Sequence, residues 1–288
     1  MKLAFALLWL IRLLPMPVIA RLGDLLGLLA YLLAGERRRV GLINLSLCFP
    51  EWSEAKRRRV LRHHFGMMMR LLLEYGIVWW SSPERLRRLV RVKNLHYLTE
   101  LRDRGEDVIL FYPHFTGFEL CALRLNLEVP LVSVYSHQKN PALDRQIYRG
   151  RNRFNRAFIV SRQEGLRPIV KAMRAEHSPF LYLPDQDFGP RDSLFVDFFG
   201  VKAATVPGLS RISKLARAKV VPAIARRVGS TLELELYPAW DNFPTDDAEA
   251  DTRRMNAFLE ARILETPEQY FWLHKRFKTR PQSEARFY

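Results

Sequence analysis

The feature that most constrains the fold is the regular alternation of short apolar runs with longer helical stretches between about residues 107 and 225. The apolar runs have the length of buried strands and are rich in Val, Ile, Leu and Phe. The runs lie at 107–112, 130–135, 157–160, 179–183 and 219–225, and the helical stretches lie at 117–127, 141–154, 165–176 and 204–218. Strands that alternate with helices form sheets with a substantial parallel part. We therefore expect an α/β fold with a mixed, largely parallel sheet flanked by helices.

Three further segments extend this pattern. Residues 53–76 carry apolar side chains at spacings of three and four, and Ser53 is a good N-cap, so a helix is predicted there. Residues 231–237 alternate apolar and polar side chains, as a half-exposed strand does. Residues 247–265 predict another helix.

The first 35 residues differ from the rest of the chain. Residues 3–34 are almost wholly apolar, but Arg12, Arg21 and Asp24 leave no charge-free stretch of the roughly 18 residues that indicate a spanning helix. The segment is a pair of core helices, an in-plane membrane anchor or a tilted span, and its density of Leu and Trp favours membrane contact. The basic residues 37–39 that follow predict that the rest of the chain lies on the cytoplasmic side.

The remainder of the chain has no linker rich in Gly or Ser, no low-complexity tract and no internal repeat. A chain of 288 residues can bury a sizeable core in a single domain. We therefore predict a membrane anchor at residues 1–35 and one globular domain at residues 36–288.

The composition indicates which partners the surface attracts. The chain has 46 Lys and Arg against 30 Asp and Glu, a formal net charge of +16. Such a surface attracts nucleic acid, an anionic membrane, a phosphorylated ligand or an acidic protein. Cys48 and Cys121 lack the spacing of metal ligands, so we predict two buried free thiols and no metal site.

The main candidate for chemistry is a histidine that follows an apolar run, with a carboxylate five residues later. Residues five apart on a helix are separated by about 140°, so His114 and Glu119 can meet only if His114 precedes the helix. Gly117 permits the bend that this requires. Glu119 would then hold the Nδ1 proton of the imidazole and leave Nε2 free to accept a proton. The pair predicts a general base that activates a hydroxyl; the structural alternative is a histidine satisfied near the edge of the sheet.

Arginines crowd one short stretch of the chain. Arg149, Arg151, Arg153 and Arg156 crowd a short stretch that begins at Arg145. They form either a solvated face or a phosphate clamp, because guanidinium groups bind phosphate through two parallel hydrogen bonds.

A second polar cluster ends a predicted strand. Asp185, Gln186 and Asp187 follow the apolar run at 179–183. The carboxyl ends of strands in an α/β sheet are where ligands usually bind. These residues are therefore candidates for substrate binding, although Asp187 could equally cap a turn.

Taken together, these segments resemble one known family, the late lipid A acyltransferases of Gram-negative inner membranes, and within it the lauroyl-type enzymes most. The resemblance runs nearly end to end. The segments that carry it are YPHFTGFEL (112–120), YSHQKNPALD (135–144), GRNRFN (150–155), LYLPDQDFGPRDSLFVDFFG (181–200), AATVPG (203–208) and PEQYFWLHKRFKTRP (267–281).

The resemblance implies roles for individual residues. His114 and Glu119 match the catalytic His-x4-Asp/Glu dyad of the family. Arg151, with Arg153 in step, and Asp185, with Gln186 beside it, match its substrate-binding segments. We accordingly expect His114 to act as general base, Glu119 to stabilise the imidazolium, and Arg151 or backbone N–H groups to stabilise the oxyanion.

The resemblance also implies a reaction, a partner and a location. The expected fold is that of glycerolipid acyltransferases, and the expected donor is an acyl-carrier-protein thioester, a co-substrate, with no cofactor. The expected acceptor is a hydroxyl on a 3-hydroxyacyl chain of a lipid A precursor, an anionic glycolipid. We expect the cell inner membrane as the location, with the catalytic domain on its cytoplasmic face.

Two other functions are compatible with parts of the sequence, as is a catalytically inactive scaffold of the same fold, which the intact His114/Glu119 pair disfavours. A glycerolipid acyltransferase would share the His/Glu pair and the thioester but acylate a lysophospholipid or glycerol phosphate. A basic nucleic-acid-binding protein would explain the charge alone and would bind any duplex in a salt-sensitive way. The hydrophobic N-terminus disfavours the second alternative, so no nucleic-acid partner is expected.

Overall fold

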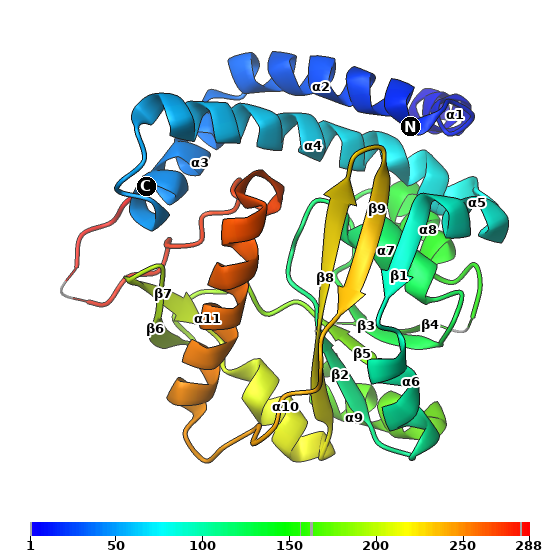
Figure 1. The fold of residues 1–288 in the computed structure, drawn as a ribbon, viewed down its shortest axis with the longest axis vertical. Coiled ribbons are helices and arrows are strands. Elements are labelled where there is room, and N and C mark those ends of the chain that lie inside the picture. The colour runs from blue at the N-terminus through cyan, green and yellow to red at the C-terminus, as the bar shows by residue number, and fades with distance from the viewer. Residues whose placement is uncertain (1, 156, 162–163, 283) are drawn as a thin grey trace.

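The computed structural model describes residues 2–155, 157–161, 164–282 and 284–288. Within these residues, seven strands form one sheet in the order β1-β9-β8-β2-β5-β3-β4. The strands are β1 (Val90–Lys93), β2 (Val108–Phe111), β3 (Leu131–Tyr135), β4 (Ala157–Ser161), β5 (Phe180–Tyr182), β8 (Lys219–Val228) and β9 (Thr231–Leu236). Neighbouring strands pair in parallel except β8 and β9, which are antiparallel. The prediction of a mixed, largely parallel sheet is confirmed (Figure 1).

Helices bury both faces of this sheet. They are α5 (Pro83–Leu89), α6 (His96–Asp103), α7 (Phe118–Leu125), α8 (Pro141–Arg151), α9 (Leu166–Glu176), α10 (Gly208–Ala216) and α11 (Ala248–Glu265), with a 3-10 turn η2 (Pro267–Gln269). Ile109 and Phe111 of β2 pack with α9, α10 and α11. Val108 and Leu110 point the other way and pack with α7. Because both faces are covered, the central strands are continuous apolar runs that can be recognised in the sequence.

One helix begins later in the structure than the sequence predicts. The stretch at 204–218 was expected to be helical throughout, but residues 201–205 form β7 (Val201–Thr205), which pairs with β6 (Leu194–Phe198) in a separate antiparallel hairpin. Helix α10 begins only at Gly208, directly after Pro207. A residue that precedes proline is biased toward extended backbone, so Val206 opposes an earlier helix start.

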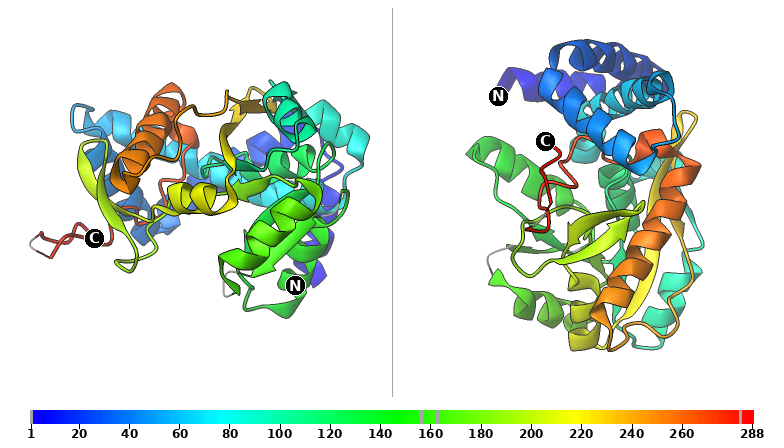
Figure 2. Two further views of the ribbon diagram at one scale, coloured as in Figure 1. Left: turned by 90° about the horizontal axis from the view of Figure 1, so that it is seen from below. Right: turned by 90° about the vertical axis from the view of Figure 1, so that its left-hand side faces the viewer.

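Four helices form the N-terminal part: α1 (Lys2–Ile11), α2 (Met16–Leu33), α3 (Gly35–Cys48) and α4 (Glu54–Trp80). The predicted N-cap is confirmed, since Ser53 Oγ accepts a hydrogen bond from the N–H of Lys56 at 3.3 Å. Helix α2 lies along α4, and Figure 2 shows the blue N-terminal helices as a layer beside the rest of the molecule. A Cβ placed on Gly27 would lie 2.3 Å from the Cα of Gly66, so only glycine allows the two backbones this approach.

The side of α1 and α2 turned away from α4 is apolar and exposed. Its exposed large side chains are Leu3, Leu7, Trp9, Leu10, Leu13, Val18, Leu25, Leu26, Leu28, Leu29, Leu32 and Leu33. Within the described residues, α2 is the helix that is long and apolar enough to cross a membrane by length and composition. The exposed leucines exclude a pair of buried core helices; the division of the chain at residue 35 stays a prediction.

The contact between α2 and α4 generates a testable prediction. We expect Gly27→Ala to destabilise the protein by about 1–3 kcal/mol, because the added methyl group overpacks the contact, although alanine ordinarily favours helices. Gly35→Ala is the matched control, because nothing lies within 4 Å of a Cβ at that position. Urea unfolding of the detergent-solubilised protein measures both variants, and equal stability of Gly27→Ala and the wild type would refute the close contact.

Candidate functional site

The centre of the site is a hydrogen-bonded pair, His114 and Asp185, delivered by neighbouring strands. In the parallel register of β2 and β5, Phe111 lies opposite Tyr182, and each chain continues through a proline to a polar residue three positions later. His114 Nδ1 lies 2.7 Å from Asp185 Oδ1, and the backbone N–H of His114 donates to Oδ2 at 3.0 Å. Since a carboxylate only accepts, Nδ1 carries the proton of a neutral ring and Nε2 is left as the acceptor.

The ionisation of Asp185 fits this arrangement. Its side chain is only 1% exposed. Burial alone would raise the pKa of the Asp185 carboxyl, but the electrostatic attraction of its carboxylate to His114 and two hydrogen bonds from that residue outweigh burial and lower the pKa below its ordinary value. Asp185 is therefore a carboxylate near neutral pH and holds the imidazole in one orientation.

The predicted hydrogen bond between His114 and Glu119 is wrong. Glu119 lies in the first turn of α7, as expected, but its Oε1 accepts from Arg151 Nη2 at 2.6 Å. Spacing along the chain indicates Glu119 as the partner of the imidazole, whereas the pairing of β2 with β5 places Asp185 beside His114. The sequence does hold a signal for this, since Tyr112-Pro113-His114 and Leu183-Pro184-Asp185 both end an apolar run with proline and a polar residue.

Glu119 and Arg151 form the second part of the site. Arg151 ends α8, and its guanidinium also lies over the ring of Tyr135, 5.6 Å from the centroid. The charge of Glu119 is the main reason that the pKa of Arg151 is raised. Burial raises the pKa of Tyr75, and the charge of Glu119 and a hydrogen bond to it add to this effect. Arg151 is thus a fixed cation held by a buried carboxylate.

Arg153, also predicted to bind substrate, contacts the backbone of another helix, and Arg156 lies outside the described residues. Its guanidinium donates to the carbonyl of Val78 at 2.6 Å and to the carbonyl of Ser81, at the C-terminal end of α4. A cation there satisfies unpaired carbonyls and the negative end of the helix dipole. Arg153 is not among the residues that line the cavity described below, so the geometry supports a structural role and gives no support to substrate binding.

A cavity of about 660 Å³ opens beside the His114–Asp185 pair. His114, Glu119, Arg151 and Gln186 are among the polar residues that line it. Apolar side chains line most of the rest, among them Ala122, Leu123, Leu131, Ala157, Ile169, Leu181 and Leu183. Gln186 therefore lies where it was predicted, at the carboxyl end of β5. Its neighbour Asp187 caps turns instead, accepting from the backbone N–H groups of Gly189 at 2.8 Å and Thr279 at 2.7 Å.

One wall of the cavity is a single face of α7 and its C-terminal end. Phe118, Glu119, Ala122, Leu123 and Asn126 all line the cavity, and their spacing places them on one side of the helix. Seven residues separate Glu119 from Asn126, which corresponds to about 10 Å along a helix.

Asn126 ends this wall with a polar group. Its side chain is 3% exposed, and its Nδ2 donates to the carbonyl of Val129 at 3.3 Å. Among the described residues, no group pairs with its buried Oδ1. The cavity can therefore hold an extended apolar chain whose reactive end lies at His114 and whose tail approaches Asn126.

The two cysteines are buried, as predicted. Burial raises the pKa of both thiols, Cys48 and Cys121. Neither is among the described residues that line the cavity. A thiol nucleophile at the cavity is therefore unsupported.

The chain is similar along most of its length to a family of known proteins. A model of the bacterial lipid A biosynthesis acyltransferase family matches residues 2–279. The lipid A biosynthesis lauroyltransferase of Escherichia coli (strain K12) is 36% identical over 283 residues, covering 97% of this chain and 92% of that protein. The myristoyltransferase of the same organism is 34% identical over 278 residues (94% and 83%), and its palmitoleoyltransferase is 33% identical over 284 residues (98% and 92%).

The hydrogen bond between His114 and Asp185 gives a prediction for acyl transfer. Asp185→Asn can donate to Nδ1 and so favours the tautomer with a proton on Nε2, which cannot act as a base. We expect turnover to fall by about two to four orders of magnitude. Nitrogen-15 NMR of the imidazole should show the proton move from Nδ1 to Nε2.

The matched control is Asp192→Asn. Asp192 also lines the cavity, but it has a φ of 60°, which asparagine tolerates, and in the described part of the chain it makes no hydrogen bond to His114. We expect this variant to keep most of its activity. An Asp185→Asn enzyme with the turnover of Asp192→Asn would show that the Asp185 contact does not orient the base.

Proposed function

This chain belongs to the bacterial lipid A biosynthesis acyltransferase family, and we propose that it transfers a lauroyl chain from an acyl-carrier-protein thioester to a lipid A precursor. The proposed acceptor is a hydroxyl on one of the 3-hydroxyacyl chains of that precursor. The observation that carries the proposal is the His114–Asp185 pair, with Nε2 left as an acceptor and His114 in the wall of a largely apolar cavity. A general base beside an apolar cavity that can hold a hydrocarbon chain suits transfer of a fatty acyl group to a hydroxyl.

The reaction follows from the orientation of the imidazole. His114 Nε2 accepts the proton of the acceptor hydroxyl as its oxygen attacks the thioester carbon. Asp185 keeps the proton on Nδ1 and stabilises the imidazolium that forms. The tetrahedral intermediate then collapses, an ester forms, the carbon–sulfur bond breaks, and the carrier thiol leaves with the proton from His114.

In this mechanism Glu119 and Arg151 stabilise the negative charge of the tetrahedral intermediate. Arg151 uses one nitrogen for Glu119 and has further N–H groups at the cavity wall, where a negative charge develops on the thioester oxygen. Glu119 therefore acts by holding Arg151, which replaces its expected role as the partner of the imidazole. The proposal requires no metal and no cofactor besides the acyl-carrier co-substrate.

The N-terminal helices support a membrane location. The exposed leucines of α1 and α2 form a continuous apolar face, while the opposite side of α2 packs along α4. A helix attached lengthwise to its domain suits insertion in the plane of the membrane surface. We propose that the protein lies on the cytoplasmic face of the inner membrane, where its net charge of +16 attracts the anionic glycolipid and the acidic carrier protein.

The acceptor and the base are tested together. Purified wild-type protein should acylate a lipid A precursor from lauroyl-carrier thioester and leave a lysophospholipid unmodified. His114→Ala should lower turnover by about two to four orders of magnitude, because general-base catalysis is lost. Cys121→Ala is the control and should keep wild-type turnover. Near-normal turnover of His114→Ala would refute the base, and acylation of the lysophospholipid alone would favour a glycerolipid acyltransferase.

The choice of acyl chain is tested at Asn126. Asn126→Ala shortens the side chain at the end of the α7 wall, so a longer chain should fit. Each additional buried methylene group stabilises by about 0.8 kcal/mol, so two should shift the product ratio from lauroyl toward myristoyl by roughly tenfold. Mass spectrometry of products from an equimolar mixture of carrier thioesters measures the ratio. Asn152→Ala, a change at a half-buried asparagine that is not among the described residues lining the cavity, is the control. An unchanged ratio in Asn126→Ala would place the acyl tail elsewhere.

A further inference from the structure

The segment between His114 and Glu119 is held from outside by a strand-like contact. Its backbone pairs with the C-terminal part of the chain, where Phe271 N–H donates to the carbonyl of His114 at 3.1 Å. The N–H of Thr116 donates to the carbonyl of Gln269 at 2.9 Å. These bonds fix one side of the segment and leave the carbonyl of Thr116 directed toward the interior.

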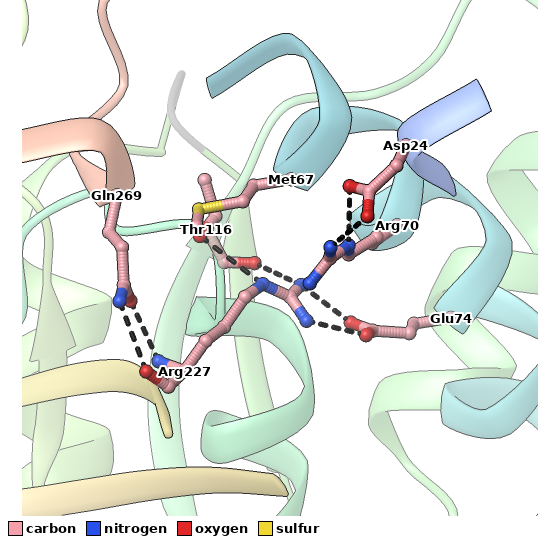
Figure 3. A network of polar contacts seen from close by, with 7 residues as sticks. All are labelled: Asp24, Met67, Arg70, Glu74, Thr116, Arg227 and Gln269. Atoms are coloured by element: carbon pink, nitrogen blue, oxygen red, sulfur yellow. Dashed lines mark hydrogen bonds and ion pairs between the residues drawn. The ribbon is translucent and has the colours of Figure 1, made fainter. Parts of the chain in front are cut away.

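A buried ion pair binds the other side of this segment. Arg227, from the end of β8, donates through Nη1 and Nη2 to the two carboxylate oxygens of Glu74 on α4, at 2.6 and 2.8 Å. The same guanidinium donates to the carbonyl of Thr116 at 2.8 Å and to its hydroxyl at 3.3 Å (Figure 3). The side chains of Arg227 and Glu74 are 6% and 1% exposed. Thr116 is therefore held by a cation that water hardly reaches.

The backbone of Arg227 is fixed as well. Gln269 accepts from the N–H of Arg227 at 2.7 Å and donates to its carbonyl at 3.1 Å (Figure 3). Arg227, which binds Thr116 through its side chain, is thus hydrogen-bonded to Gln269, which binds Thr116 through its backbone carbonyl. This closed arrangement leaves the segment little freedom to move.

A contribution to folding stability does not by itself explain the buried Arg227–Glu74 ion pair. Desolvation of two charges is costly, and buried ion pairs replaced by apolar residues of similar volume often leave a protein equally stable or more stable. Burial alone would lower the pKa of Arg227, but the charge of Glu74 and the hydrogen bonds to it raise the pKa, so the guanidinium stays charged. An apolar pair could fill the space, but it could not donate hydrogen bonds to Thr116.

A second ion pair and a sulfur contact tie α4 to its two neighbours. One turn before Glu74, Arg70 on α4 pairs with Asp24 on α2, with Nε 3.1 Å from Oδ1 (Figure 3). The hydroxyl of Thr116 also donates to Met67 Sδ on α4 at 3.9 Å. Helix α4 therefore contacts both the apolar layer on one side and the segment of the site on the other.

We propose that Arg227 and Glu74 are positioning residues that hold Thr116 and thereby set the placement of His114 and Glu119 across the cavity. Thr116 lies midway between the strand that presents His114 and the helix that presents Glu119. A displacement of Thr116 would move the base relative to the Glu119–Arg151 pair. This inference rests on the proposed acyl-transfer function for its kinetic readout.

The experiment replaces the ion pair by apolar residues. We expect Arg227→Met combined with Glu74→Leu to fold with a Tm close to that of the wild type. Its kcat should fall by roughly ten- to hundredfold with KM nearly unchanged, because misplacement of about 1 Å costs rate rather than binding. The matched control is Arg253→Met with Glu260→Leu, which removes an ion pair of the same two-bond geometry, 2.6 and 2.8 Å, on α11. That control should keep its kcat.

Two further measurements keep the inference testable if the double variant does not fold or the reaction is a different one. Arg227→Lys keeps a cation for Glu74 but lacks the fork that reaches Thr116, so its kcat should fall while the protein stays folded. Hydrogen–deuterium exchange of the peptide spanning residues 112–118 should be faster in both variants, whatever reaction the wild type catalyses. Unchanged exchange of this peptide in the variants would overturn the positioning role, and so would a loss of activity that only follows the folded fraction. If the wild type is inactive in acyl transfer but the variants exchange faster, only the proposed function is refuted.

Discussion

The site depends on the parallel pairing of β2 with β5. This pairing aligns Phe111 with Tyr182, and both strands then continue in step through a proline to His114 and Asp185. The carboxyl ends of adjacent parallel strands meet at one edge of the sheet, which is why such edges bind ligands. A shift of register would separate the carboxylate from Nδ1 and leave a buried acid without its partner. The helix α7, the cavity and Arg151 are arranged around this one hydrogen bond.

Much of the charge in the interior is arginine paired with carboxylate, and each pair has a distinct task. Glu119 holds Arg151 at the cavity wall, and Glu74 holds Arg227 beneath the segment that carries His114. Arg153 is bound to carbonyls at the end of α4. Guanidinium groups suit all three tasks because they remain charged when buried and donate in fixed directions.

Much of the fold could be predicted because the central strands are buried on both faces and therefore appear as continuous apolar runs. The hairpin of β6 and β7 was not predicted, because Ala203, Ala204 and Thr205 are compatible with either helix or strand and their pairing with β6 decides. In the site, His114, Glu119, Arg151, Asp185 and Gln186 were all predicted as candidates, and the structure gathers them at one cavity. Arg153 was not distinguished from Arg151, since both lie at the end of one helix and only the packing of α8 against α4 separates them.

The sequence by itself determined the class of fold, the apolar N-terminal layer and the identity of the histidine at the end of a strand. These features depend on local periodicity and on burial of each element, which neighbouring residues specify. Only the tertiary structure decided which carboxylate orients the imidazole and which carboxylates hold the arginines. Asp185 is 71 residues from His114, and Glu74 is 153 residues from Arg227. Contacts at such separations are set by strand order and helix packing, because hydrogen bonds act over about 3 Å in space regardless of distance along the chain.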